Sequence, residues 1–294
     1  MSDSTEPITF DAAAAAELEQ AAYAMAAEAG AAILDTLGQE IIVSYKDQAS
    51  GDRAPTNPVS DADQAVEAMI EERIRTQFPD HAFLGEETVD SFDAAAEFTW
   101  AVDPIDGTQN FVNGVPFYSC SIGVFEGSTP VAGAIWGVAT HLGRAGVYHA
   151  HRGGELRFDG EPIANNGRAT SGRLRGIAAT PMGSQRRAAG WDYRSLGSTA
   201  LEGALVAAGA LAGARNPDPH VWDIAASAVL VEAAGHEVWT KPPRAGRRVG
   251  SGGAGSGGGQ SQWEPLTAID PAGFATWRQP VVVANEAAAA ELRK

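Results

Sequence analysis

A short acidic turn, DPIDGT at residues 103–108, restricts the fold of this chain more than any other segment. It follows an apolar run that is typical of a buried strand. Pro104 has no backbone N–H and disfavours helical backbone in the residue before it, so the strand is expected to end at Asp103. Gly107 then permits a sharp turn, which lets the carboxylates of Asp103 and Asp106 converge. With the Ile105 carbonyl as a further oxygen ligand, the turn predicts a site for a hard cation such as Mg²⁺.

Residues 108–111 are expected to form a helical turn beside this site. The free N–H groups of a helix N-terminus suit phosphate, and cations next to an anion pocket are what phosphoryl transfer requires. Two further acidic groups lie at predicted element boundaries: Glu86 and Glu87 after a strand, and Asp223 at the start of a helix. Taken alone, each acidic group would be explained most simply as an acidic residue in a turn or as a negative charge at a helix N-terminus. Together the three groups, each at an element boundary, favour a functional site that holds metal and phosphate over three separate structural acids.

The acidic composition agrees with this interpretation. The 294 residues carry a formal net charge of −16, which disfavours nucleic acid and anionic membranes as partners. No apolar run reaches the ~18 residues of a membrane-spanning helix, and no signal peptide is recognisable, so a cytoplasmic location is expected. Cys120 has no second cysteine to pair with and is expected in the core.

Sequence periodicity predicts an antiparallel sheet in the middle of the chain and an alternation of helix and strand after residue 155. The expected helices are residues 11–37, 62–78, 199–211, 221–234 and 286–294. The expected strands are residues 41–44, 81–84, 98–102, 119–125, 131–138, 144–148 and 281–284. Asp11 is a predicted N-cap, and Ser60 with Asp63 is a predicted capping box. His149 and His151, at a strand end, are interpreted as surface residues. The glycine-rich residues 243–262 are predicted to form a flexible surface loop.

Several segments resemble the signatures of the inositol monophosphatase family. They are GEE at 85–87, WAVDPIDGT at 100–108, VWDIAA at 221–226 and, upstream, VSDAD at 59–63. The likeness covers about residues 11–240. It implies a layered α/β fold with alternating α and β layers, of the inositol-monophosphatase-like sugar phosphatase type.

The resemblance also implies two halves. The N-terminal half, residues 1–155, would contain the antiparallel sheet and most metal ligands. The C-terminal half, residues 156–294, would contain the substrate segment and Asp223. A homodimer is implied as well.

Particular roles follow from the same resemblance. Roughly two to three Mg²⁺ ions would be held by Glu86, Asp103, the Ile105 carbonyl, Asp106 and Asp223. The catalytic residues that position and support the attacking water would be Asp63, Glu87 and Thr108. The substrate, a small phosphorylated metabolite, would be bound by Gly107, Thr108, Gly197, Ser198, Thr199 and Asn216. Ser198 or Thr199 is also a candidate N-cap for the helix that follows, and the two roles can coexist.

One position departs from the family pattern. Inositol-cleaving members carry an acid seven positions before the aspartate of the W-D motif, where this chain has Asn216. An amide can hydrogen-bond a hydroxyl but carries no charge, which argues against inositol phosphate as the natural substrate. The prediction is a Mg-dependent phosphomonoesterase for a small polyol- or sugar-type phosphate. Histidinol-phosphatase, fructose-1,6-bisphosphatase and 3′-phosphonucleotide phosphatase are alternatives. A non-catalytic binding or regulatory homologue is the alternative from another class.

Overall fold

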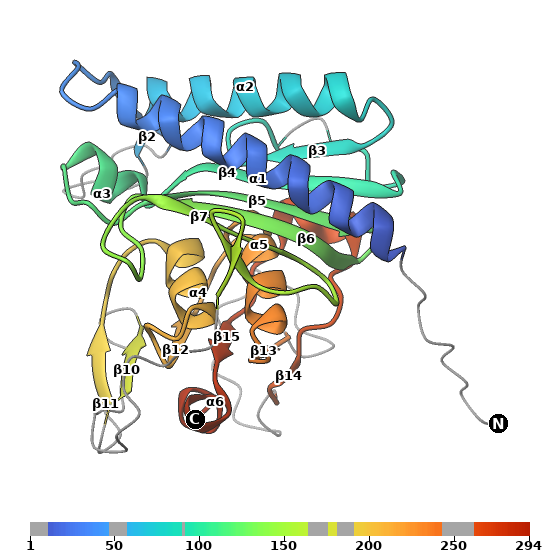
Figure 1. The fold of residues 1–294 in the computed structure, drawn as a ribbon, viewed down its shortest axis with the longest axis vertical. Coiled ribbons are helices and arrows are strands. Elements are labelled where there is room, and N and C mark those ends of the chain that lie inside the picture. Colours follow the sequence, from blue (N-terminus) through green and yellow to red (C-terminus); the bar gives the residue numbers. More distant parts are fainter. Residues whose placement is uncertain (1–10, 47–57, 90–91, 164–175, 181–190, 243–261) are drawn as a thin grey trace, which may run out of the picture.

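Helices and sheets alternate as layers through the molecule (Figure 1). A computed structural model describes residues 11–46, 58–89, 92–163, 176–180, 191–242 and 262–294. Its helices are α1 (Ala12–Asp35), α2 (Asp61–Gln77), α3 (Thr108–Val112), α4 (Thr199–Ala207), α5 (Val221–Ala233), α6 (Glu286–Leu292) and the 3₁₀ helix η2 (Pro271–Thr276). The predicted glycine-rich loop lies almost entirely outside the described residues.

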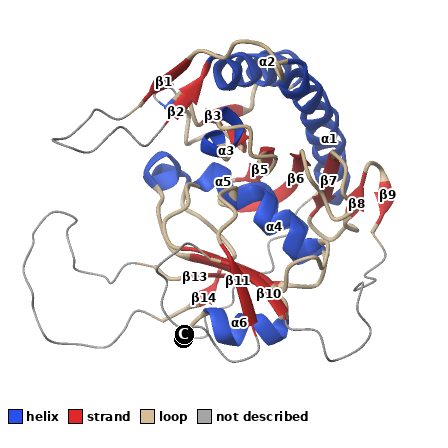
Figure 2. Ribbon diagram, turned by 90° about the vertical axis from the view of Figure 1, so that its left-hand side faces the viewer, coloured by secondary structure: helices blue, strands red, loops and turns tan. Residues whose placement is uncertain are grey.

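The larger sheet lies between two helical layers. Its strands, in spatial order, are β3 (Ala82–Gly85), β4 (Phe98–Asp106), β5 (Ser119–Glu126), β6 (Thr129–Gly137), β7 (Gly146–His151), β8 (Arg157–Phe158) and β9 (Glu161–Pro162). Only the β3–β4 pair of this sheet is parallel, which confirms the predicted antiparallel sheet. Helices α1 and α2 pack on one face, and α5 with α4 on the other (Figures 1 and 2).

A second, mixed sheet lies beyond α4 and α5, with α6 on its far side (Figure 2). Its strands, in spatial order, are β11 (Trp191–Arg194), β10 (Gly176–Ala179), β12 (Gly213–Asn216), β15 (Val281–Ala284), β13 (Glu237–Thr240) and β14 (Glu264–Pro265). A short ladder of β1 (Val43–Tyr45) and β2 (Pro58–Ser60) precedes α2. The resulting order of layers confirms the predicted layered α/β fold.

Local signals set several of these elements as predicted. Asp11 caps α1 by accepting the N–H groups of Ala13 and Ala14, and Ser60 with Asp63 forms a capping box at the start of α2. Cys120 is fully buried in the core. Helix α4 ends at Ala207, earlier than expected from its continuous apolar sequence. None of the described helices combines the length and apolarity required to cross a bilayer.

Strand β4 does not end at Asp103, contrary to the prediction. It continues to Asp106, and its register with β5 shifts on the way, because Asp103 lies opposite Ser121 and Asp106 opposite Ser119. Two residues, Pro104 and Ile105, therefore face a single residue of β5. This two-against-one arrangement is a β-bulge, and proline is tolerated at bulges within a sheet. Residues three apart on a regular strand point to opposite faces. The extra residue of the bulge allows both aspartates to point to the same side.

His149 is not a surface residue, so that interpretation is wrong. It is fully buried beneath α1, and its Nδ1 lies 2.6 Å from Oε1 of Glu19. Its Nε2 accepts the N–H of Gly160 at 3.2 Å, so the ring proton lies on Nδ1 and is donated to Glu19. His151, partly buried, contacts the other carboxylate oxygen. Burial alone would raise the pKa of Glu19, but the hydrogen bonds with the two histidines oppose it and the pKa is lowered.

Replacing Glu19 by leucine is expected to destabilise the protein at neutral pH by about 1–3 kcal/mol, because a buried imidazole N–H loses its acceptor. A carboxyl whose pKa is lowered by folding contributes stability above its unfolded pKa, near 4.3, and loses it as the pH falls through the folded value. Thermal unfolding across this range should therefore show a difference from the wild type that shrinks in acid. Glu17→Leu, at an exposed position of the same helix, is the control; an equal loss of stability there would contradict the assignment.

Candidate metal centre

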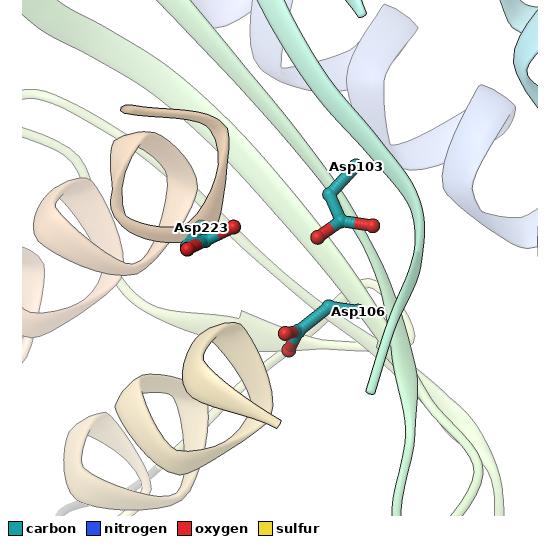
Figure 3. Close-up of side chains that lie close together, drawn as sticks. All are labelled: Asp103, Asp106 and Asp223. Carbon is teal, nitrogen blue, oxygen red and sulfur yellow. The ribbon is translucent and has the colours of Figure 1, made fainter. Parts of the chain in front are cut away.

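Three aspartates from distant parts of the chain meet between the larger sheet and α5. Asp103 and Asp106 lie at the end of β4, and Asp223 lies in the first turn of α5. One carboxylate oxygen from each lies within 4.8 Å of the others. Figure 3 shows the three carboxylates directed toward a common point. The bulge in β4 and the start of α5 together produce this arrangement.

Asp103 gives the clearest sign of what the cluster binds. The side chain is 3% exposed, and its Oδ1 has no hydrogen-bond partner among the described residues. Burial, followed by the charges of Glu86, Asp106 and Asp223, raises its pKa well above the ordinary value. An unpaired buried carboxylate oxygen is costly unless a cation or a proton satisfies it. An all-oxygen donor set is what Mg²⁺ prefers, so these residues fit a divalent cation.

Asp106 is held by the N-terminus of α4. It accepts hydrogen bonds from the backbone N–H groups of Thr199 (3.1 Å) and Ala200 (2.8 Å), from the Ser119 hydroxyl (3.0 Å) and from the Ser198 hydroxyl. The carboxylate therefore caps α4, and its charge is stabilised by the helix dipole. The predicted side-chain cap of α4, from Ser198 or Thr199, is absent. Ser198 occupies the N-cap position, but its hydroxyl donates a hydrogen bond to Asp106. Burial nevertheless raises the pKa of Asp106.

Asp223 has a similar relation to α5. It is the third residue of the helix and accepts the N–H of His220 at 2.8 Å. Burial, then the charges of Asp106 and Glu86, raises its pKa well above the ordinary value. Two helix N-termini thus point at the cluster, which partly offsets the repulsion between its carboxylates. Without a cation, the remaining repulsion still disfavours the ionised forms.

Glu86 and Glu87 follow β3 but lie outside the group of three aspartates. Their carboxylates each lie 2.7 Å from the ammonium of Lys46. Burial would lower the pKa of Lys46, but the two glutamates outweigh it and raise that pKa. Burial also raises the pKa of Glu87 to about 7, against the opposing effect of Lys46. Lys46 thus places a positive charge beside Glu86, a predicted metal ligand, and Glu87, predicted to support the attacking water.

Asp63 and Thr108 lie together, as the catalytic assignment requires. The Thr108 hydroxyl is 3.1 Å from Oδ1 of Asp63 and 2.9 Å from the Ile105 carbonyl oxygen. Asp63 also accepts the backbone N–H of Ser60 at 2.9 Å. Burial raises the pKa of Asp63. A hydroxyl has one proton and two lone pairs, so Thr108 can donate to either acceptor and still accept a hydrogen bond from water.

Gly107 connects the bulge to α3 in a backbone conformation that favours glycine. Its φ is +91°, and a Cβ there would lie 3.0 Å from the Gly197 carbonyl oxygen. This close approach places the turn against the segment before α4. That segment borders a pocket of about 320 Å³ whose lining includes Gly197, Ser198, Thr199, Asn216 and Asp223. The predicted substrate residues 197–199 and 216 therefore share one pocket beside the aspartates.

Glu67 is a buried acid that was not predicted from the sequence. It accepts the Glu87 N–H at 2.9 Å and the Thr88 hydroxyl at 2.8 Å, and so holds the segment that carries Glu86 and Glu87. A Cβ on Gly85 would lie 2.4 Å from the Glu67 carboxyl carbon, so any larger residue there would displace that carboxyl. A signal was present, because position 67 follows Asp63 by four residues on the buried stripe of α2.

Because Glu86 is a predicted metal ligand, Glu67→Ala is expected to lower kcat/KM by about 10–100-fold, the range for losing a residue that orients such a ligand. The expected cause is a misplaced Glu86–Glu87 segment, so steady-state phosphatase kinetics at saturating Mg²⁺ should reveal it. Glu72→Ala, at an exposed position of the same helix, should leave the rate unchanged. Wild-type kcat/KM in the Glu67 variant would contradict this role.

Comparison with known proteins gives a consistent result. The sequence model described as "Inositol monophosphatase family" matches residues 14–268. Inositol-1-monophosphatase SuhB of Mycobacterium tuberculosis is 34% identical over 79% of this chain and 86% of its own length. The histidinol-phosphatase of the same organism is 32% identical over 66% of this chain and 78% of its own length. The extragenic suppressor protein suhB of Bartonella henselae has a similar fold, with a TM-score of 0.66 and 23% identity over 96% of this chain and 97% of that one.

Proposed function

The chain belongs to the inositol monophosphatase family and is a hydrolase of phosphoric monoesters, and on this premise we propose that it uses Mg²⁺ to cleave the phosphate ester of a small polyol or sugar-type alcohol. The observation that carries this proposal is the convergence of Asp103, Asp106 and Asp223 around an unpaired buried oxygen. Such a donor set has no evident structural purpose without a cation.

In this proposal the metal ligands are the carboxylates of the three aspartates and of Glu86, with the Ile105 carbonyl. Roughly two to three bound Mg²⁺ ions would supply Lewis acidity and neutralise charge on the phosphate. Glu86 is paired with Lys46 in this structure, so Glu86 must release the Lys46 ammonium in order to bind a metal ion. Glu87, with its pKa raised to about 7, supports the water network at the edge of the site.

The chain's own groups position the attacking water. The Thr108 hydroxyl donates to Asp63, which leaves a lone pair of Thr108 to accept a proton from water. The buried Asp63 carboxylate holds the hydroxyl in that orientation and can receive its proton. The backbone N–H groups of Gly107 and Thr108 contact the phosphate, as expected at the start of a helical turn.

The leaving alcohol occupies the pocket lined by residues 197–199 and Asn216. Among its described lining residues there is no lysine or arginine, whereas Asp218 and Asp223 are acidic. Arg278, nearby, is engaged by Asp218 at 2.8 Å. This lining favours a monophosphate over a bisphosphate, because a second phosphate would meet acids instead of cations. It also supports an amino-alcohol phosphate as a second candidate, in line with the histidinol-phosphatase relative.

A panel of phosphate esters tests the proposal. Purified protein with Mg²⁺ should release inorganic phosphate from a polyol, sugar or amino-alcohol monophosphate, and more slowly from fructose 1,6-bisphosphate or a 3′-phosphonucleotide. A chelator should abolish release, and added Mg²⁺ should restore it. Failure to cleave any member of the panel, with the metal bound, would favour the non-catalytic alternative.

The homodimer and the cytoplasmic location complete the proposal. The first follows from the family resemblance, and the second agrees with a chain whose single cysteine, Cys120, is buried and unpaired. Light scattering on purified protein measures the first, and fractionation of the native cell the second.

A further inference from the structure

Glu202 is a buried acid that the mechanism above does not use. It lies in the first turns of α4 and is 4% exposed. Its carboxyl accepts the backbone N–H of Leu196 at 3.3 Å, and the N–H of Gly197 and the side chain of Asn216 also hydrogen-bond to it. Acids are rarely buried to this extent unless each oxygen has a partner. The partners of Glu202 are therefore a guide to its purpose.

On one side, Glu202 holds the segment that fixes Asp106. The backbone folds back at Gly197 with a φ of +82°, and the next three residues give Asp106 a hydroxyl and two N–H groups. Hydrogen bonds to Leu196 and Gly197 anchor this segment immediately before those donors. A displacement of the segment would therefore displace the Asp106 carboxylate.

On the other side, Glu202 reaches the pocket for the leaving alcohol. Asn216, one of its partners, lies 3.5 Å from the Thr199 hydroxyl through its amide oxygen. Both residues line the pocket of about 320 Å³ together with Glu202 and Asp223. The Thr199 hydroxyl and the Glu202 carboxyl, both of α4, thus lie beside the Asn216 amide.

We infer that Glu202 is a positioning residue for the phosphatase reaction, whose carboxyl links the support of Asp106 to the pocket residue Asn216. The inference rests on the proposed function, because it assigns Asp106 to the metal site and the pocket to the substrate. Glu202 is neither one of the proposed metal ligands nor one of the predicted substrate-binding residues, and the inference explains why an acid is buried within α4. Loss of such an outer support typically costs about 10–100-fold in metal affinity or activity.

The inference depends on the reach of the side chain more than on its charge. Burial, then the nearby Asp106 charge, raises the pKa of Glu202 to about 8, so the carboxyl is largely protonated at neutral pH. Glutamine has the same length and a carbonyl oxygen that accepts the same N–H groups. Aspartate keeps the carboxyl but is one methylene shorter, so it cannot reach them from the same backbone.

The test compares Glu202→Gln, Glu202→Asp and Glu202→Ala with Ser227→Ala, a buried control on α5 that packs against Gly203 of α4 and whose hydroxyl donates to the Ile224 carbonyl of its own helix. Three quantities are measured on folded protein: the Kd for Mn²⁺ by electron paramagnetic resonance, and kcat and KM for the best substrate. The aspartate and alanine variants should bind Mn²⁺ about 10–100-fold more weakly and lose a similar factor in kcat/KM. Glutamine should restore both to within a few-fold, roughly 1 kcal/mol.

Wild-type Mn²⁺ affinity and kcat/KM in the aspartate variant would overturn the inference, and so would an equal loss in the glutamine variant. A lower melting temperature with unchanged Mn²⁺ affinity and kcat/KM would also overturn it, because Glu202 would then have only a structural role. Mn²⁺ binding needs no turnover. A wild-type protein that binds Mn²⁺ but cleaves no ester would contradict the proposed function, and the effect of Glu202 on metal affinity would still be measured.

Discussion

Replacing Asp103 by asparagine is expected to lower kcat/KM by more than about 100-fold, the upper range for losing a mere support of a metal ligand. The same change should make the metal-free protein more stable. Asp103 is buried with one oxygen unpaired, and neighbouring carboxylates raise its pKa, so removing its charge relieves repulsion within the cluster. Each kcal/mol regained should raise the melting temperature by roughly 2–4 °C. Enzyme kinetics and calorimetry in a chelator measure the two effects.

Asp106→Asn provides the matched comparison. It should also abolish activity, but it should destabilise the metal-free protein, because the carboxylate is the cap of α4 and accepts hydrogen bonds at both oxygens. An amide NH₂ at either position would face an N–H or hydroxyl donor. If both variants lose activity but their stabilities change in opposite directions, Asp103 destabilises the metal-free protein by charge repulsion, whereas Asp106 stabilises it by capping α4. Destabilisation of both variants would contradict our description of Asp103.

Saturating Mg²⁺ is expected to stabilise the wild type by about 2.7 kcal/mol at a concentration of 100 times Kd, through binding to the native state alone. At a fixed Mg²⁺ concentration, this gain in stability should grow with pH. Folding raises the pKa of Asp103 and Asp223, so their contribution in the metal-free protein is most favourable below the unfolded pKa, near 3.9. It is lost as the pH rises through the raised folded values. Mg²⁺ binding requires the ionised carboxylates and therefore becomes stronger over the same range.

Melting curves from about pH 5 to about pH 8, with a chelator and with Mg²⁺, measure this coupling. Asp103→Asn is the control, and its Mg²⁺-dependent gain should be small at every pH. A wild-type gain that is independent of pH would mean that the cation does not bind to the protonatable carboxylates of this cluster.

Much of the site was predictable because its signals are local. The proline–glycine turn, the capping box at Ser60 and Asp63, and an acid in the first turn of α5 each follow from neighbouring residues. The individual helices and strands followed from the periodicity of the sequence, whereas the layered fold was implied by the family resemblance. That Asp103, Asp106 and Asp223 would meet was an expectation from the family resemblance, because spacing alone does not fix contacts between such distant residues.

The errors concern contacts between distant segments. Pro104 was expected to end β4, but a bulge opposite β5 accommodates it, and that bulge depends on the partner strand. His149 was interpreted as exposed because its partner, Glu19, is 130 residues earlier in the chain. A side-chain cap at Ser198 was expected because the sequence does not reveal that Asp106 already caps α4. In each case a remote residue satisfies a group that appears unpaired locally.

Anomalous X-ray scattering from crystals soaked in Mn²⁺ tests the central claim most directly. We predict a strong peak about 2.1 Å from a carboxylate oxygen of Asp103, with Asp106 and Asp223 completing the coordination of the same or an adjacent ion. Absence of a peak among these three aspartates, in crystals that hold Mn²⁺ elsewhere or not at all, would contradict the metal centre and the phosphatase mechanism built on it.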